Sequence, residues 1–344
     1  MNKRLSRRQA LRLIASTSAA FLVSRQAVDQ STLGIVQAAS DAGDKPIVYM
    51  TQDISPEALL KIYEALGRKV EGSVAVKISS GEPGGHHFLS PDLIAPLVQE
   101  VNGTIVECNT AYGGLRSNTK AHQRVIEEHG FTAIAPTDIM DADGTMSLPI
   151  VGGKHLAEDI VGAHFANYDF VVNLAHFKGH AMAGFGGVIK NMSIGIASST
   201  GKSLIHSAGR LTTGIGLGTP QDDFLESMAE AAKGVADYLG ENILYINVMN
   251  YLSVDCDCDG SPAAPTMADI GILASLDPVA LDQACVDLVY AAPDGQDLIK
   301  RMESRNGIHT LEHAEEIGLG TREYELVSID EASTTRHREV KSKA

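Results

Sequence analysis

The fold class is decided by residues 169–174, which read Asp169-Phe170-Val171-Val172-Asn173-Leu174. A nearly uniform apolar run of this length is typical of a strand that is covered on both faces of a sheet. Short apolar runs alternate with amphipathic stretches on either side of it: we expect strands at 47–50, 73–79, 104–107, 132–135, 243–250, 269–275 and 324–329, and helices at 55–70, 90–101, 120–128, 220–239 and 278–290. This alternation predicts an α/β fold with a largely parallel sheet and helices on both faces. It leaves open either one continuous domain or two lobes with a boundary near residue 150.

Composition and charge narrow the class of partner. The chain has 344 residues, 44% of them hydrophobic, which is enough for a sizeable core. Its formal net charge is −15, whereas nucleic acids and anionic membranes attract basic surfaces. No apolar run after residue 40 approaches the roughly 20 residues that span a bilayer. We therefore expect no nucleic acid as a partner and no membrane contact for the mature protein; the small anionic partner that we expect follows from the basic and glycine-rich site described below.

The N-terminal segment has the features of an export signal. Residues 1–12 carry five basic residues and no acid, 13–23 are moderately apolar, and Val36-Gln37-Ala38 offers small residues for cleavage. Residues 6–11, Ser-Arg-Arg-Gln-Ala-Leu, resemble a twin-arginine signal. We expect an export signal and linker at 1–40, the α/β domain at 41–330, a polar tail at 331–344, and a periplasmic or extracellular location. A general secretory signal or an uncleaved anchor is the alternative.

A glycine-rich turn follows the buried strand, at the carboxyl end of the sheet, where α/β proteins bind ligands. Gly184, Gly186 and Gly187 allow backbone amides to approach a ligand, and a helix that begins near Gly187 would add its positive end. Lys190 would lie about one turn inside that helix, as a point charge or a covalent attachment site, next to Asn191. The glycines are thus candidate cofactor-binding residues together with Lys190 and Asn191. The alternative is a tight turn with no ligand.

Three histidines, His176, His180 and His206, belong to the same stretch. A histidine after a strand is often a hydrogen-bonded structural residue, but three of them with two lysines and three glycines at a strand end indicate a site. We predict that His180 and Lys190 are catalytic residues of such a site.

A pair of cysteines lies in an acidic loop, Asp255-Cys256-Asp257-Cys258-Asp259-Gly260. In an extended chain alternate side chains share a side, so both thiols would point the same way. Adjacent acids disfavour thiolates unless a cation is present, so Cys256 and Cys258 are predicted metal ligands. Two thiolates under-coordinate zinc or an iron–sulfur cluster, so Cys108, His176 or a second subunit would supply partners. A Ca²⁺-like acidic loop and an oxidisable turn are the alternatives.

From about residue 72 to 328 the chain resembles the bacterial and archaeal family called domain of unknown function 362, whose members are often labelled iron–sulfur-centre proteins. The resemblance lies in residues 173–180 (Asn-Leu-Ala-His-Phe-Lys-Gly-His), 186–191 (Gly-Gly-Val-Ile-Lys-Asn), 255–258 (Asp-Cys-Asp-Cys) and 274–282 (Ala-Ser-Leu-Asp-Pro-Val-Ala-Leu-Asp). Some members carry a ferredoxin-like insert with closely spaced cysteines. This chain has four cysteines and no such run, so the resemblance does not bring an iron–sulfur cluster with it.

A more distant resemblance is to the nickel-pincer lactate racemase. His180, nine intervening residues, Lys190, fifteen intervening residues and His206 are similar to its histidine–lysine–histidine spacing. The resemblance implies an acid/base role for His180, a covalent cofactor anchor at Lys190 and a metal ligand at His206. The racemase has a second histidine in a Gly-x-His-Arg turn, whereas the comparable residues 112–116 here are Tyr-Gly-Gly-Leu-Arg. Lactate racemisation itself is therefore not expected.

Two functional hypotheses follow. The first is an exported enzyme that depends on a cofactor or metal (nickel, zinc or iron) and acts on a small anion, by proton or hydride transfer next to a carbonyl. The second is a non-enzymatic metal-binding or iron–sulfur electron-transfer accessory that uses Cys256 and Cys258. The substrate, the metal and the oligomeric state are left open.

Overall fold

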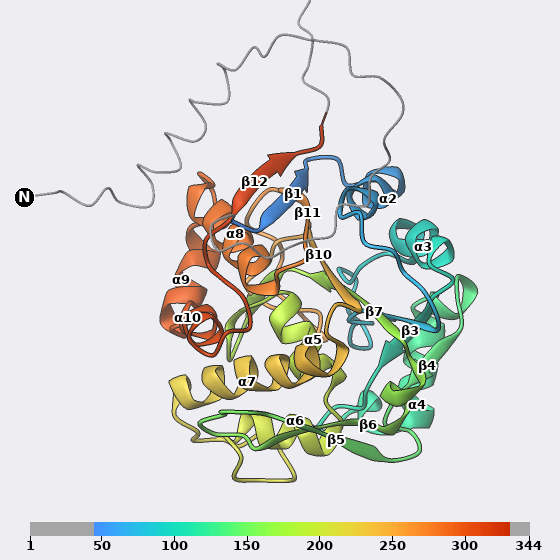
Figure 1. The fold of residues 1–344 in the computed structure, drawn as a ribbon, viewed down its shortest axis with the longest axis vertical. Helices are drawn as coiled ribbons and strands as arrows, with labels where there is room; N and C mark the ends of the chain where they lie inside the picture. Colours follow the sequence, from blue (N-terminus) through green and yellow to red (C-terminus); the bar gives the residue numbers. More distant parts are fainter. Residues whose placement is uncertain (1–44, 331–344) are drawn as a thin grey trace, which may run out of the picture.

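The computed structural model describes residues 45–330 and has an eight-stranded sheet in the order β12-β1-β11-β10-β7-β2-β3-β4 (Figure 1). The strands are β1 (Ile47–Thr51), β2 (Val74–Lys77), β3 (Thr104–Glu107), β4 (Thr137–Ile139), β7 (Phe170–His176), β10 (Ile243–Met249), β11 (Gly271–Ser275) and β12 (Glu325–Ser328). All neighbours are parallel except β11, which is antiparallel to both β1 and β10. The prediction of an α/β fold with a largely parallel sheet is confirmed.

Helices cover both faces of the sheet, as Figure 1 shows. One face packs on α2 (Pro56–Ala65), α3 (Pro91–Glu100) and α4 (Thr119–Glu128). The other packs on α5 (Val188–Ile196), α7 (Gln221–Leu239), α8 (Pro278–Ala291), α9 (Gln296–Ser304) and α10 (His309–Glu316). Alternate residues of β7 point to opposite faces of the sheet: Val171 faces the layer of α5 and α7–α10, and Val172 faces the layer of α2–α4. All seven residues of β7 are buried, as its apolar sequence indicated.

Smaller elements lie outside the large sheet. β5 (Thr145–Pro149) and β6 (Glu158–Gly162) form one antiparallel pair, and β8 (Lys178–His180) and β9 (Gly184–Gly186) form another. The helix α6 (Ser199–His206) begins at Ser198, whose hydroxyl accepts the Gly201 amide. Strands from before and after residue 150 hydrogen-bond within the same large sheet.

One expected strand is wrong. Residues 132–135 were expected to be extended, but Phe131–Ala133 form a 3₁₀ turn and β4 begins only at Thr137. Gly130, with φ of 85°, turns the chain at the end of α4, and Pro136 then restricts the residue before it. The strand therefore begins five residues later than its apolar pattern indicated and pairs with β3 from Thr137, opposite Ile105.

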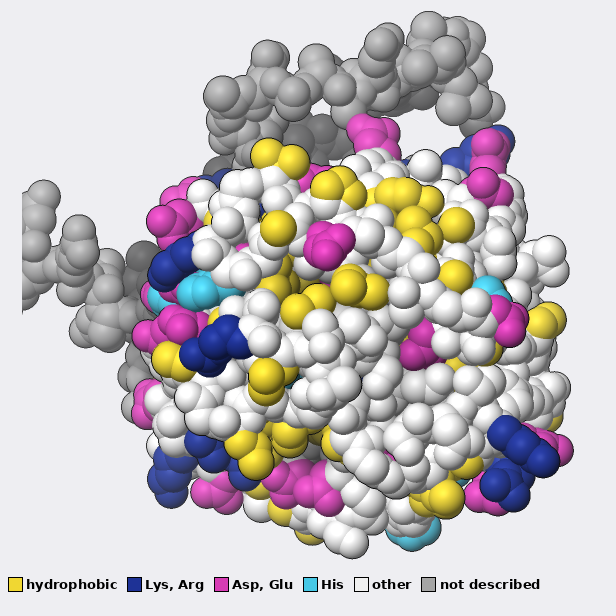
Figure 2. All heavy atoms as spheres, turned by 90° about the horizontal axis from the view of Figure 1, so that it is seen from below, with side chains coloured by type: hydrophobic (Ala, Val, Ile, Leu, Met, Phe, Trp, Pro, Cys, Tyr) yellow, Lys and Arg dark blue, Asp and Glu magenta, His cyan; other side chains and the backbone are white. Residues whose placement is uncertain are grey.

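The surface shows no single dominant charge type on the face seen in Figure 2, where Lys and Arg side chains lie in small groups among Asp and Glu. Within residues 45–330, no helix is both long and apolar enough to cross a membrane. The predicted export signal, most of the linker and the polar tail lie outside the described residues.

Candidate functional site

Two cavities that share lining residues lie at the carboxyl edge of the parallel strands, beside a third of about 40 Å³ that Gly186, Gly187 and Lys190 help to line. The inner cavity, of about 100 Å³, is lined by the last residues of β2 and β3, Lys77 and Glu107, and by side chains of α5 and α6. The outer cavity, of about 500 Å³, lies between loops 82–83, 112–115 and 255–260. Both share the side chains of His180, His206 and Cys258. The combined space suits a small molecule, and it lies where parallel strands end together, as α/β ligand sites do.

His180 is the last residue of β8, and the residue is 7% exposed. Its Nδ1 accepts hydrogen bonds from the backbone amides of Met182 (3.3 Å) and Ala183 (2.9 Å). A nitrogen that accepts from amides carries no proton, so the neutral ring bears its proton on Nε2. Burial, and then the charges of Lys190 and His206, hold the pKa of His180 well below its ordinary value. His180 therefore offers the cavity a neutral N–H donor.

His206 is the last residue of α6 and has the opposite tautomer. Its Nδ1 donates to the Lys202 carbonyl at 2.6 Å, which leaves the Nε2 lone pair free. Burial lowers the pKa of His206 to about 4. A histidine whose Nδ1–H is fixed by a carbonyl is the usual arrangement for a metal ligand or a proton acceptor at Nε2.

Lys190 lies in the first turn of α5 and borders the inner cavity. Among the described residues, none accepts a hydrogen bond from its ammonium or forms an ion pair with it. Burial, and then the charges of Lys77 and Arg116, lower the pKa of Lys190 to about 8. A Cβ at Gly186 would lie 2.9 Å from Lys190 Cδ, so the glycine makes room for the lysine stem. The amine is thus partly neutral near pH 8 and available to a ligand.

Lys77, Glu107 and Arg116 form a buried charge network that sequence reasoning missed. Lys77 Nζ lies 2.9 Å from Glu107 Oε2, and Arg116 lies 3.5 Å from Glu107 Oε1 and 2.8 Å from Glu82. Although burial alone would raise it, the charges of Lys77 and Arg116 lower the pKa of Glu107 to about 2. The signal was available: Lys77 and Glu107 end adjacent parallel strands, at the edge where sites form.

The start of α5 is already occupied by a carboxylate. Asp282 Oδ1 accepts the Val188 amide at 2.9 Å and Oδ2 accepts the Ile189 amide at 3.0 Å. A Cβ at Gly187 would lie 2.2 Å from Asp282 Oδ1, so this glycine admits the buried acid. The predicted ligand contact to the positive end of this helix is therefore wrong for these two amides, because Asp282 already accepts from them. Gly184 and Gly186 belong to β9 and pair with His180 and Lys178.

Asn191 links α5 to the sheet. Its Nδ2 donates to the Lys77 carbonyl (2.9 Å) and to Asn173 Oδ1 (2.7 Å), and its Oδ1 accepts from Lys77 Nζ (3.1 Å). Each polar atom of the side chain thus has a protein partner. In this structure Asn191 fixes Lys77 and borders the inner cavity without a free donor.

His176 and Lys178 hold the cysteine loop through Asp257. His176 Nδ1 lies 2.9 Å from Asp257 Oδ2, and its Nε2 lies 2.8 Å from the Asn250 carbonyl. Lys178 Nζ lies 2.8 Å from Asp257 Oδ1. Burial on its own would raise the pKa of Asp257, but His176 and Lys178 lower it. Both nitrogens of His176 are engaged, so it positions the loop and presents no lone pair to a metal in this arrangement.

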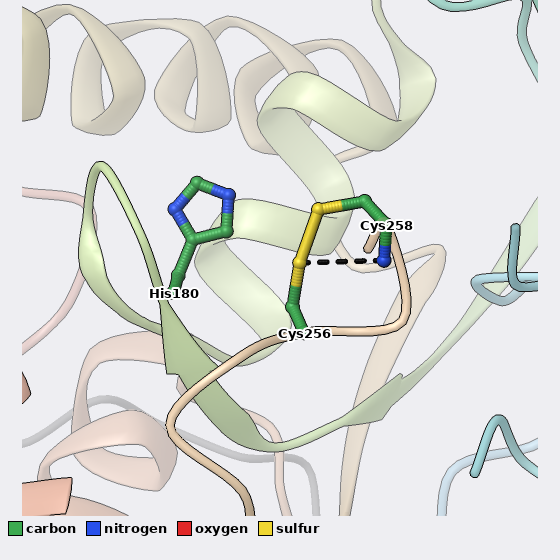
Figure 3. Close-up of side chains that lie close together, drawn as sticks. All are labelled: His180, Cys256 and Cys258. Atoms are coloured by element: carbon green, nitrogen blue, oxygen red, sulfur yellow. Dashed lines mark hydrogen bonds between the residues drawn. A yellow bond between two sulfur atoms is a disulfide. The ribbon is translucent and has the colours of Figure 1, made fainter. Parts of the chain in front are cut away.

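Cys256 and Cys258 lie beside His180, as Figure 3 shows, and form a disulfide with each other. With Asp257 turned inward, both sulfurs point to the same side, as the alternation of the loop predicted. One ligand atom from each of His180, Cys256 and Cys258 falls within 4.8 Å of the others. His180 carries its proton on Nε2, and the two sulfurs are bonded to one another. The disulfide must therefore be reduced, and the His180 ring must turn, before this group can bind a metal.

The remaining cysteines offer no further thiolate to this loop. Cys108 is buried, donates to the Ile196 carbonyl, and has its pKa raised to about 12 by burial. Cys285 is buried beside Asn247, and burial raises its pKa well above the ordinary value.

Comparison with known proteins places the chain in a family. No curated protein matches it. A solved structure that is similar is the lactate racemase apoprotein from Thermoanaerobacterium thermosaccharolyticum, at 14% sequence identity and a TM-score of 0.45, covering 72% of this chain and 58% of the racemase. The chain thus spans somewhat more than half the length of that protein. Residues 74–287 match the family described as Domain of unknown function (DUF362), and the chain therefore belongs to that family.

Proposed function

We propose that this protein is an enzyme that depends on a metal or a metal-containing cofactor and acts on a small anion, by proton or hydride transfer next to a carbonyl. One observation carries the proposal: His180 and His206 present opposite tautomers to one cavity, which also contains the unpaired amine of Lys190. A merely structural polar cluster would have its donors and acceptors satisfied within the protein.

The charge of the inner cavity supports an anionic substrate. Its lining has four basic residues (Lys77, Arg116, Lys190 and Lys202) and one acidic residue (Glu107). The whole chain, by contrast, has a formal net charge of −15. Positive charge concentrated in this inner cavity attracts a small anion once it has passed the outer cavity, whose lining includes Glu82, Asp255 and Asp259.

His180 can polarise a substrate carbonyl. Its Nε2–H is a neutral donor that the two backbone amides hold in place, so it stabilises negative charge as it develops on the carbonyl oxygen. Such a bond makes the neighbouring C–H more acidic and the carbonyl a better hydride acceptor. Lys190 would then neutralise the anionic group of the substrate or attach the cofactor.

The residues fit a metal-containing group at Lys190 and His206. Lys190 has a pKa of about 8 and no acceptor within residues 45–330, which suits covalent attachment of a cofactor. His206 directs an unprotonated Nε2 into the same cavity, which suits metal ligation. A bound group of this kind would supply a Lewis acid and an electron-pair acceptor beside the substrate.

The accessory hypothesis has less support. An iron–sulfur centre requires several thiolates, and the chain has four cysteines, of which two form a disulfide and two are buried with raised pKa values. Iron with acid-labile sulfide in the purified protein would nevertheless favour this alternative.

Intact mass and elemental analysis of protein purified from its native host test the proposal. We expect a covalent adduct or a bound transition metal in the parent, loss of the adduct in Lys190→Arg, and loss of the metal in His206→Gln. Lys233→Arg is the matched control, because Lys233 already pairs with Asp237 at 2.7 Å on α7. If Lys190→Arg and His206→Gln keep the parent's mass and metal content, the proposed site is wrong.

A further inference from the structure

A second group of histidines and carboxylates lies between α7, α10 and the 150–157 loop. Glu226 and Glu230 are one turn apart on α7, and His309 and His313 are one turn apart on α10. Residues four apart share a helix face, and α7 packs against α10. His155 reaches the same place from the loop. We call these five residues the α7–α10 cluster.

The part of the cluster around Glu226, with His155 and His309, has the composition of a metal site. His155 Nε2 lies 2.5 Å from Glu226 Oε2, and His309 Nε2 lies 3.0 Å from Glu226 Oε1. Asp223, three residues before Glu226 on the same helix, adds a second carboxylate. One ligand atom from each of His155, Asp223 and Glu226 lies within 4.8 Å of the others. Tetrahedral zinc, with bonds of about 2.0–2.1 Å, places its ligand atoms about 3.3 Å apart, so small side-chain shifts close this set around an ion.

The rest of the cluster, Glu230 and His313, holds the candidate metal ligands in place. The Glu230 side chain is fully buried and accepts the backbone amides of Lys154 (2.7 Å) and Leu156 (2.8 Å), while His313 Nε2 lies 3.3 Å from it. Glu230 therefore fixes the loop from which His155 projects. Partners that orient ligands in this way are typical of metal sites.

The ammonium of Lys154 already pairs with Glu226 in this cluster, and it can be displaced. Lys154 Nζ lies 2.7 Å from Glu226 Oε2, yet 60% of the lysine side chain is exposed. The Glu226 side chain is only 9% exposed, but solvent screens the lysine end of the pair, so an incoming dication can displace the ammonium. His155 and His309 would each lose the Nε2 proton to solvent as the ion binds, as histidine ligands do.

We propose that His155, Asp223 and Glu226 bind a divalent transition-metal ion, and that His309, which hydrogen-bonds Glu226 and lies outside the 4.8 Å group, turns in as the fourth ligand. Zn²⁺ is the best match to two imidazoles and two carboxylates. The site is separate from the cavities that His180 and His206 line. It joins the 150–157 loop to α7 and α10. It does not depend on the proposed catalytic function.

Calorimetric titration of the EDTA-treated full-length protein with Zn²⁺ tests this site. We expect His155→Gln and His309→Gln each to weaken this binding step at least about tenfold. Lys154→Ala should tighten it about threefold, since it removes the competing ammonium and is expected to fold normally. His164→Gln is the matched control: His164 also lies between two carboxylates, Asp138 at 2.8 Å and Asp143 at 2.9 Å, but has no second histidine in its contacts.

The variants separate this site from the pocket. A Zn²⁺ step that is lost only in His206→Gln would place the metal in the pocket and overturn the α7–α10 proposal. Identical titrations of the parent, His155→Gln, His309→Gln and Lys154→Ala would also overturn it. Co²⁺ absorption in the visible range gives a second readout, and its disappearance in His155→Gln with retention in His206→Gln supports the proposal.

Discussion

The pocket and the α7–α10 cluster use the same residue types in opposite ways. In the pocket His180 and His206 each keep one nitrogen for the cavity, and Lys190 has no acceptor among the described residues. In the cluster each histidine meets a carboxylate, and Glu230 accepts several backbone amides. Buried bases without counter-ions reduce stability unless a ligand completes them, whereas paired ones hold helices together. The difference teaches that the pocket lacks counter-charges and needs a ligand to supply them, whereas the cluster is already paired and can take a metal ion only by displacing protons and the Lys154 ammonium.

The largest expected effect is on Glu230. Glu230→Gln places an amide N–H₂ against backbone N–H groups and removes the charge that faces His313, so we expect a loss of about 3–5 kcal/mol in the free energy of unfolding. Urea denaturation measures it. Glu316→Gln is the control, because Glu316 is exposed and its contact with His313 is 3.4 Å; this change should stay within about 0.5 kcal/mol. A loss below about 1 kcal/mol in Glu230→Gln would show that the cluster does not hold α7 to the loop.

The next effect is an opposite pH dependence of the two regions. The folded-state pKa of His206 is lowered to about 4, below its unfolded value of about 6.5. The unfolded chain therefore binds a proton first, and up to about 3 kcal/mol of stability is lost as pH falls from about 6.5 toward 4. The hydrogen bond to Glu230 raises the pKa of His313. Its contribution is present below about pH 6.5 and is lost as pH rises through the raised value.

These two pH dependences are measured as the free energy of unfolding of the parent, His206→Gln and His313→Gln between about pH 4 and 9. His206→Gln should flatten the acid side and leave the alkaline side unchanged. His313→Gln should do the reverse. Equal slopes in the parent and in both variants would mean that neither histidine titrates differently on folding.

The smallest expected effect is a gain in stability on replacing Lys190. Lys190→Met removes an ammonium that is partly desolvated and has no acceptor in the described part of the chain, so we expect stability to rise by up to about 1 kcal/mol while ligand content is lost. Thermal unfolding measures the gain. Lys178→Met is the matched contrast, since Lys178 bonds Asp257 and the His87 carbonyl and its loss should destabilise the protein. Destabilisation of Lys190→Met to the same extent would place Lys190 among the structural lysines.

The fold was largely predictable because it depends on local patterns. The apolar run at 169–174 became the fully buried β7, and the Ser-Pro and Asp-Pro pairs began helices at Pro56, Pro91 and Pro278, with Asp277 accepting the Val279 and Ala280 amides. Such periodicity and capping are properties of neighbouring residues. The error at 132–135 arose where a left-handed glycine and a proline overrode the apolar pattern.

The sequence by itself determined the α/β class, the strand-end position of the histidine–glycine–lysine stretch, and the shared direction of the two thiols, because each follows from spacing along one segment. Only the tertiary structure decided which nitrogens are free. Asp282 reaches the α5 amides from residues far along the chain, and Asp257 occupies both His176 and Lys178. Export remains a prediction, since residues 1–44 lie outside the described part. These hydrogen-bond partners are distant in the sequence. Whether a histidine can bind a ligand or has only a structural role therefore depends on the tertiary structure.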